Sequence, residues 1–520
     1  MSDHQDSAPA EQGAVIHLPP IVVAETPVEL ESSKTSGVWL LLAILGFFVG
    51  VVSFFPARTP DILLSLAYGR GLADGSITLG AEPFSYALGS YWANPHWLFD
   101  LVAFGLYQAD GQAGFLLIAG KTAVLVIAMV LLAWRFSREN SWAASILILA
   151  TAVGALAASP YFDVSPSMIG FPLTALLLSI LTLDANAWRT VRMVGLPLTM
   201  LLWVNLDSSF LFGLVVWILW FVIPGNEKRG SGELRLLAFG VAALLVSPFH
   251  VRSFMALPEI LAPVGGVADR MDPLVIERLL DSGFSIQRFT ETQLALNPAG
   301  LAFPILLAIS LASFVVHPKA LLSWRFVAIV LATGLAAYRH KAIPWFAAIG
   351  TIVSCLNLID GLGSIKAWRL MVGRGAILSF LLLMGASLIG LPGFLHASGA
   401  RSTPRLPGWG LALRESNREL ALGMAQTPKT DGSNWLVASL SYPDQASYVA
   451  WFAPGIRTLS THVSTCLLRN TDHLQTQLKP WASLTAQPTF QAPTGASCWP
   501  ATASSMLPQR CGLAILPSVF

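Results

Sequence analysis

Charged residues are scarce in this sequence. They make up only 12% of the 520 residues, against roughly 25% in a soluble domain. Hydrophobic residues account for 54%. Because there are too few charges to cover a water-exposed surface of this size, the composition excludes an ordinary soluble globular protein. A net charge of +2 and the absence of a basic tract also give no support for nucleic-acid binding.

Motifs of several enzyme and transporter classes are absent. The chain has no Walker motif, no G-x-G-x-x-G fingerprint, no H-E-x-x-H and no C-x-x-C. ATP-driven transport, nicotinamide chemistry and zinc proteolysis therefore lack support. No internal repeat is visible, and the acidic residues lie at the ends of apolar segments rather than within them. Both features argue against a secondary transporter.

Cysteine is also rare, with four residues in the whole chain. Cys355 lies within an apolar segment, whereas Cys466, Cys498 and Cys511 lie near the C-terminus and cannot all pair with one another. If the C-terminal part is outside the cytoplasm, a Cys498–Cys511 disulfide is the most economical arrangement. The alternative is that all three thiols are free or buried.

What the chain does contain is a series of apolar runs. A helix needs about 20 residues to cross the hydrocarbon core, so these runs predict an all-α polytopic membrane bundle. We expect eleven transmembrane helices, at residues 37–55, 111–134, 142–158, 166–183, 195–206, 208–223, 236–249, 301–316, 326–338, 342–359 and 376–395.

Lys and Arg in the short connections predict the orientation of the bundle. Five short connections are basic, and placing all five in the cytoplasm leaves the N-terminus inside and the C-terminus outside. Residues 1–36 carry six acids and one Lys, which does not fit a cleavable signal peptide. We therefore expect a disordered cytoplasmic tail at 1–36, a transmembrane region at 37–395, and localisation in the bacterial inner membrane.

The composition changes after the last apolar run. Residues 396–520 are richer in Ser, Thr, Gln and Pro and contain no further span. A strand is expected within 435–440 and a helix within 444–452. This length suffices for a small domain, so we predict an extracytosolic α/β-type domain at 396–520.

The longest polar stretch between two spans is the predicted outer loop 56–110. We expect a helix at 61–73 and a second helix at 96–107 that lies on the membrane surface. Asp61, Glu82 and, in a later outer loop, Asp163 are candidate catalytic carboxylates, because a carboxylate can take a proton from an acceptor hydroxyl. The alternative for Asp61 is an N-cap and for Asp163 a cap or turn former. The cofactor is not identified, and a divalent cation with oxygen ligands is the candidate.

Further polar residues are predicted at the same outer face. Arg339 and Lys341 are two cations at a helix boundary and suit a phosphate. The alternative is that both side chains snorkel to lipid headgroups. Asp207 lies in a hairpin between two apolar helices, where it either closes the turn or belongs to a site. The candidate substrate-binding residues are Arg339, His340, Lys341, His96, Asp100 and Asp207.

Parts of the outer loop resemble a known family. The similar runs are Thr59-Pro60-Asp61, Ala67-Tyr68-Gly69-Arg70, Glu82-Pro83-Phe84-Ser85-Tyr86 and Trp92-Ala93-Asn94-Pro95-His96-Trp97-Leu98-Phe99-Asp100. In order and spacing they resemble the first outer loop of bacterial GT-C-type membrane glycosyltransferases, whose pattern reads D-P-D-x-W-W-H-L-A-x-G-R, D-P-F-S-Y and W-x-N-H-E-W-L-x-E. The similarity is good over residues 56–135 and thinner to residue 360. The chain is also similar to uncharacterised planctomycete multi-span membrane proteins, through runs at 203–207 and 448–454.

The resemblance implies transfer of a sugar from a polyprenyl-phosphate donor at the outer face. It implies that Asp61 and Asp163 match the family's loop carboxylates and that Arg339 or Lys341 holds the lipid phosphate, with membrane lipid and an unidentified acceptor as the other partners. This sequence departs from the pattern, with Thr59 in place of the leading Asp and Pro95-His96-Trp97 in place of H-E-W. The alternative is therefore a catalytically degenerate GT-C-fold protein that acts as a scaffold or binding module through residues 396–520.

Overall fold

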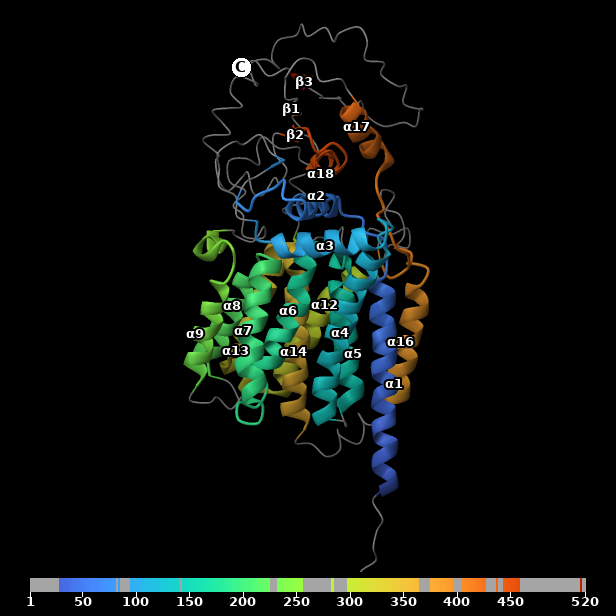
Figure 1. Cartoon of the computed structure of the whole chain (residues 1–520). Helices are drawn as coiled ribbons and strands as arrows, with labels where there is room; N and C mark the ends of the chain where they lie inside the picture. The colour runs from blue at the N-terminus through green and yellow to red at the C-terminus, as the bar shows by residue number, and fades with distance from the viewer. Residues whose placement is uncertain are drawn as a thin grey trace, which may run out of the picture.

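The computed structural model describes residues 28–80, 83–84, 94–140, 143–224, 232–255, 282–284, 297–363, 375–396, 405–426, 436–437, 443–458 and 515–516. Figure 1 shows an upright bundle of helices, two helices lying across one of its ends, and a smaller segment beyond them. Most of the described residues are helical. The fold is therefore predominantly α, as the apolar runs predict.

The upright bundle has a helix at each of the eleven predicted places. They are α1 (Val28–Ser53), α4 (Phe115–Glu139), α5 (Ala144–Ala158), α6 (Pro166–Leu181), α7 (Arg189–Leu206), α8 (Phe210–Val222), α9 (Glu233–Leu244), α12 (Pro298–Val316), α13 (Trp324–Tyr338), α14 (Ile343–Leu362) and α16 (Ala376–Gly390). In lipid a helix satisfies its backbone groups within one segment. The two apolar runs on either side of Asp207 form separate helices, as predicted.

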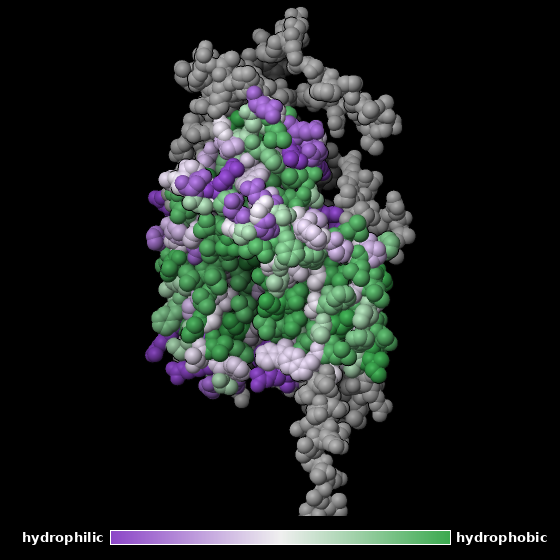
Figure 2. All heavy atoms as spheres, turned by 45° about the vertical axis from the view of Figure 1, so that its right-hand side comes forward, coloured by the Kyte–Doolittle hydropathy of each residue, from purple (hydrophilic) through white to green (hydrophobic). Residues whose placement is uncertain are grey.

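Length and composition mark this bundle as a membrane domain. Among the described residues, four segments are long and apolar enough to cross a membrane, namely Phe115–Arg138, Ala144–Tyr161, Pro298–Val316 and His340–Leu362, and shorter apolar helices accompany them. Figure 2 shows hydrophobic side chains in a broad band across the visible face of the bundle, with hydrophilic residues gathered above and below the band. The chain is a helical membrane protein.

The helices α5 and α14 approach each other closely in the centre of the bundle. A Cβ on Gly154 would lie 2.0 Å from Thr351 Oγ1, so a larger residue there would push the two helices apart. Small residues are typical of helix contacts in membranes, because they let backbones come close and increase van der Waals contact. Alanines of α5, among them Ala155, Ala157 and Ala158, are buried in the same core.

The predicted outer loop forms the two helices that lie across the end of the bundle. They are α2 (Asp61–Ala73) and α3 (Trp97–Ala109), and Figure 1 shows both lying across the end of the upright helices. A Cβ on Gly69 would lie 2.2 Å from the carbonyl oxygen of Asp100, so the two helix backbones touch. Trp97 Nε1 donates to Asn205 Oδ1 at 2.9 Å and ties α3 to the end of α7. The helix predicted at 96–107 is therefore present, and its position at the membrane surface stays a prediction.

In the described part of the chain, four short 3₁₀ helices join the larger elements. They are η2 (Ser159–Tyr161), η3 (His250–Met255), η6 (Pro318–Leu322) and η7 (His340–Ala342). Because successive helices alternate in direction, the turns at 54–60, 159–165, 207–209 and 339–342 all reach the end covered by α2 and α3. This alternation brings polar residues that are far apart in the sequence to one place.

The C-terminal part lies against the far side of α2. It contains α17 (Glu415–Gln426), α18 (Pro443–Phe452) and three short strands, β1 (Leu436–Val437), β2 (Arg457–Thr458) and β3 (Ile515–Leu516), in the order β2-β1-β3. Tyr448 and Val449 of α18 share a hydrophobic core with Ile62 and Leu66 of α2. The predicted strand near 435–440 and helix near 444–452 are confirmed in position. The predicted pairing of Cys498 with Cys511 lies outside the described residues.

Candidate functional site

A cavity of about 250 Å³ lies between α2 and the end of the bundle. Four stretches of the bundle end, together with α2, the start of α3 and the segment after α16, form its walls. Its lining residues are Thr59, Asp61, Leu64, Ser65, Tyr68, Asn94, His96, Asp100, Pro160, Tyr161, Asp163, Ser165, Pro166, Ser167, Asp207, Ser208, Ser209, His340, Lys341, Pro344, Trp345 and Arg405.

The cavity brings together most of the residues predicted from the sequence. Seven of the nine candidates line it, namely Asp61, His96, Asp100, Asp163, Asp207, His340 and Lys341. Of the other two, Arg339 is buried next to the cavity without lining it. Glu82 lies outside the described residues. The predicted chemistry requires the outer loops to converge. In the structure, candidate residues from separate loops line one cavity.

Asp61 is the first residue of α2. Pro60, whose backbone angles are helical, is the N-cap of α2, so Asp61 is not itself the N-cap. A carboxylate in the first helical turn interacts favourably with the positive end of the helix dipole. Asp61 is exposed and lines the cavity, so its carboxylate is placed where a ligand can reach it.

Asp163 acts as a clamp between two loops. Its Oδ2 accepts hydrogen bonds from Thr59 N at 2.9 Å and from Thr59 Oγ1 at 2.6 Å, and Val164 N donates to Oδ1 at 2.7 Å. Arg58 N lies 3.1 Å from each carboxylate oxygen. The side chain therefore joins the turn after α5 to the start of the outer loop, beyond the local cap or turn that the sequence offered as the alternative.

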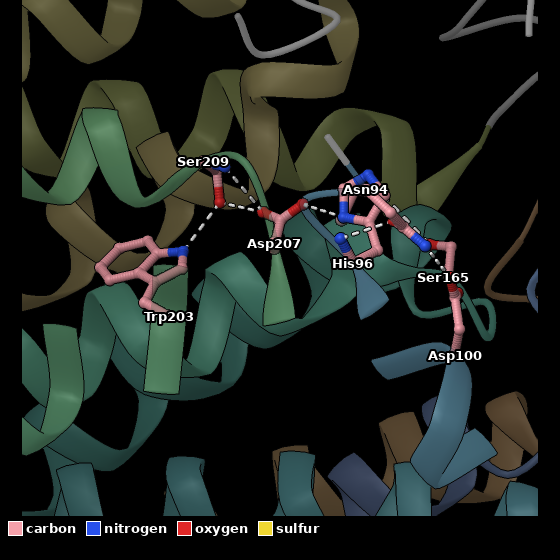
Figure 3. A network of polar contacts seen from close by, with 8 residues as sticks. Asn94, His96, Asp100, Ser165, Trp203, Asp207 and Ser209 are labelled. Atoms are coloured by element: carbon pink, nitrogen blue, oxygen red, sulfur yellow. Dashed lines mark hydrogen bonds and ion pairs between the residues drawn. The ribbon is translucent and has the colours of Figure 1, made fainter. Parts of the chain in front are cut away.

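A chain of polar contacts lines the wall formed by α3 and the α7–α8 turn (Figure 3). Asp207 Oδ2 accepts from Ser209 N at 3.1 Å and also from the Ser209 hydroxyl, so Asp207 does close the turn. Its Oδ1 lies 3.7 Å from His96 Nδ1. Asp207 thus closes the turn and also lines the cavity.

The same wall continues from His96 to Asp100. His96 N donates to Asn94 Oδ1 at 2.9 Å, and Asn94 Nδ2 donates to Asp100 Oδ2 at 2.7 Å. Asp100 is buried, and this burial raises its pKa from 3.8 to about 7, although hydrogen bonds from Asn94 and Ser65 act in the opposite direction. The Asp100 carboxyl therefore exchanges its proton near neutral pH.

We expect Asp100 to make the stability of the protein fall as the pH rises. The folded state keeps the Asp100 proton up to pH 7, whereas the unfolded state loses it near pH 4, so stability declines between these two values. Asp100→Asn should flatten this decline and stabilise the protein at pH 8 by at most about 4 kcal/mol. Thermal unfolding of both proteins in detergent across this pH range tests the prediction.

Asp74 is a control of opposite sign for this measurement. It lies at the C-terminal end of α2, and hydrogen bonds from Ser76 lower its pKa. Its contribution is therefore present above pH 4 and lost as the pH falls, so Asp74→Asn should lower stability at pH 8. A wild-type profile that does not change between pH 5 and pH 8, or that Asp100→Asn leaves unaltered, would contradict the assignment.

The cationic side of the cavity is formed by His340, Lys341 and Arg405. His340 stacks on Tyr161 at 5.7 Å between ring centroids, and its Nδ1 lies 3.0 Å from the Tyr161 hydroxyl. Lys341 lines the cavity. Arg339 instead stacks on Tyr338, with its Cζ 4.7 Å from the ring centroid. Of the three consecutive residues predicted to bind substrate, His340 and Lys341 therefore line the cavity, whereas Arg339 is buried beside them.

Arg405 is the cavity residue that the sequence did not reveal. It follows the last bundle helix and reaches back to the turn after α5, where its Nη1 donates to Ser159 O at 2.9 Å and its Nη2 to Pro160 O at 2.7 Å. Burial lowers its pKa to about 10, which leaves it charged at neutral pH. No sequence motif marks Arg405, because its position depends on the return of the chain across the bundle.

The described residues do not fit a divalent cation well. They contain no group of three or more His, Cys, Asp or Glu side chains placed to hold a metal ion. Metal binding requires oxygen lone pairs that are open to the ion, and those of Asp163 already accept from N–H and O–H groups. We derive no step through a metal ion. Glu82, predicted as a catalytic carboxylate, lies outside the part of the chain that the structure describes.

Comparison with known proteins identifies the fold. No protein-family model and no curated protein matches the sequence. The crystal structure of the apo oligosaccharyltransferase from Archaeoglobus fulgidus superposes with a TM-score of 0.54 at 12% identity, over 82% of this chain and 64% of that chain. Archaeal oligosaccharyltransferase AglB from the same organism, in complex with an inhibitory peptide and a dolichol-phosphate, gives 0.53 at 12% identity over the same shares.

These matches show the class of fold. The chain has the GT-C-like glycosyltransferase fold of the archaeal oligosaccharyltransferase and spans 64% of its length. The GT-C resemblance predicted from the outer loop is confirmed at the level of fold. The similarity to planctomycete membrane proteins stays a prediction.

Proposed function

We propose that this protein is an integral membrane glycosyltransferase that transfers a sugar from a polyprenyl-phosphate donor to an acceptor at the outer face of the cytoplasmic membrane. The observation that carries the proposal is the cavity, in which carboxylates and cations from separate loops meet at one end of an apolar bundle. The fold supports it, since a structural neighbour was solved in complex with a dolichol-phosphate and an inhibitory peptide.

We assign four roles to the residues in and around the cavity. Asp61 accepts a proton from the acceptor hydroxyl as the acceptor oxygen bonds to the sugar anomeric carbon, and the bond from that carbon to the donor phosphate breaks. Lys341 and His340 bind the polyprenyl phosphate that leaves, assisted from a buried position by Arg339. His96, Asp207 and Asp100 bind hydroxyls of the sugar or the acceptor. Asp163 holds Asp61 in place through Arg58 and Thr59, and Glu82 is a further predicted carboxylate of the loop.

We propose the following topology for this function. The eleven bundle helices span the membrane, residues 1–36 form a cytoplasmic tail, and α2, α3 and residues 396–520 lie outside. The cavity then faces the outer leaflet. The support is the alternation of helix direction, which places the turns 54–60, 159–165, 207–209 and 339–342 at one end.

A transfer assay in proteoliposomes tests the proposed activity. The purified chain is supplied with a mixture of polyprenyl-phosphate sugars and with lipid, peptide and saccharide acceptors, and release of polyprenyl phosphate is measured by mass spectrometry. We expect release that depends on both donor and acceptor. Lack of release with every donor in a correctly folded sample would overturn the proposal.

A second candidate function is a non-catalytic scaffold that keeps the fold. The observation that favours it is Asp163, whose carboxylate is occupied by the backbone of the neighbouring loop and by Thr59. In that case the cover formed by α17 and α18 over α2 is the functional surface. Absence of transfer, together with unchanged complex formation by an Asp61→Asn variant in cross-linked membranes, would favour this function.

A further inference from the structure

Two buried basic side chains, Lys121 and Arg405, lie near Asp163. Lys121 belongs to α4 and Arg405 to the segment after α16, and both interact electrostatically with the Asp163 carboxylate. The ring of Phe55 joins them, since Lys121 Nζ lies 3.9 Å and Arg405 Cζ 4.7 Å from its centroid. We call Asp163, Lys121, Arg405 and Phe55 the cation cluster.

Among the described residues, neither Lys121 nor Arg405 forms an ion pair with a carboxylate. Lys121 Nζ donates to the carbonyl oxygen of Phe55 at 3.2 Å. Arg405 uses two of its five N–H donors for Ser159 O and Pro160 O. Neither side chain lies within ion-pair distance of a carboxylate in the part of the chain that the structure describes. The cluster therefore places two basic side chains, of which Arg405 is charged at neutral pH, beside the single carboxylate of Asp163.

Hydrogen-bond donors already occupy the Asp163 carboxylate and leave no lone pair open to a metal ion. A carboxylate offers about four lone-pair sites, and Arg58 N, Thr59 N, Thr59 Oγ1 and Val164 N occupy those of Asp163. Thr59 stands where the GT-C pattern has its leading Asp, and the Thr59 hydroxyl donates to Asp163. Position 59 therefore supplies a hydrogen-bond donor rather than a second carboxylate. A metal ion would have to displace these donors and would then meet two basic side chains.

We propose that the cation cluster takes the place of a divalent cation, so that this protein binds a phosphate-bearing ligand in its cavity without a metal ion. The inference rests on the proposed function for the identity of the ligand, a polyprenyl phosphate. Arg405 lines the cavity and presents its guanidinium to phosphate oxygens. Lys121 is a second basic side chain of the cluster, since both Lys121 and Arg405 lie against the Phe55 ring.

Binding of undecaprenyl phosphate to the full chain in nanodiscs tests the inference. Affinity is measured in excess EDTA, Mg²⁺ and Mn²⁺, and we expect it to change by a factor of about two at most. Loss of one charge of the cluster should weaken binding about tenfold in Arg405→Gln, with a smaller loss in Lys121→Met. Arg405→Lys should retain part of the affinity. Lys319→Met removes a cation in η6 and is the matched control, with unchanged binding expected.

The outcomes are distinct. Binding that EDTA weakens tenfold or more and that Mn²⁺ restores would overturn the inference, as would wild-type affinity in Arg405→Gln. Because either variant could fail to fold, a titration of the wild-type chain with Mn²⁺, followed by electron paramagnetic resonance, gives an independent readout. We expect no stoichiometric site, and stoichiometric binding that Asp61→Asn removes would overturn the inference. If undecaprenyl phosphate does not bind under any condition, the proposed donor is wrong, and the Mn²⁺ titration still decides whether the cluster excludes a metal ion.

Discussion

Sugar transfer is expected to disappear in Asp61→Asn. This substitution removes the proton acceptor while it keeps the shape of the side chain at the start of α2. Loss of a positioned general base lowers the rate by roughly 10²- to 10⁴-fold. Because Asp61 is exposed and is the first helical residue, its loss should leave the bundle intact. Donor-dependent release of polyprenyl phosphate in proteoliposomes measures the effect.

Asp74→Asn is the matched control for Asp61→Asn. Asp74 lies at the other end of the same helix, is exposed, and does not line the cavity. Its variant should retain wild-type transfer, which separates the role of Asp61 from a general change in the charge of the loop. Transfer that survives in Asp61→Asn would mean that another group accepts the proton, and the remaining cavity carboxylates would be tested next.

Asp163→Asn is expected to cause a large loss of stability. Its amide would turn an N–H₂ group toward the backbone N–H groups of Arg58 and Thr59, which now donate to the carboxylate. It would also leave Lys121 and Arg405 without their neighbouring negative charge. A buried hydrogen-bond donor left without its acceptor costs about 1–3 kcal/mol, and Asp163 accepts from several such donors. A large fall in the thermal unfolding temperature in detergent is the expected measurement.

Two further variants show where this loss comes from. Asp184 also accepts two backbone N–H bonds, but it is exposed at the opposite end of the bundle, so Asp184→Asn should cost only about 1 kcal/mol. Lys121→Met should restore part of the stability of Asp163→Asn, because it removes a charge that has lost its neighbour. Equal losses in Asp163→Asn and Asp184→Asn would contradict the clamp.

Much of the secondary structure follows from local features of the sequence. The helix expected at 61–73 is found at Asp61–Ala73, because Pro60 sets the helix start and apolar residues continue after it. The helix expected at 96–107 is found at Trp97–Ala109, because this apolar, aromatic segment contains neither Gly nor Pro before Gly105. Both features depend on residues close together in the chain.

Contacts between residues far apart in the chain could not be predicted from such local features. Asp163 was weighed as a cap, a turn former or a catalytic acid, whereas it binds Arg58 and Thr59 about a hundred positions earlier. Arg405 had no motif, and it enters the cavity only because the chain returns across the bundle after α16. Arg339 and Lys341 are neighbours in sequence, yet only Lys341 lines the cavity, since the short helix η7 turns successive side chains in different directions.

The sequence by itself determined that this is a membrane bundle of helices with polar turns, because hydrophobic length and backbone satisfaction in lipid leave no other arrangement for such apolar runs. It also determined which polar residues lie at the turns. Only the tertiary structure decided which of these side chains face a common cavity and which hold the loops together. That decision depends on hydrogen bonds between turns far apart in the chain, and such bonds exist only after the helices have packed.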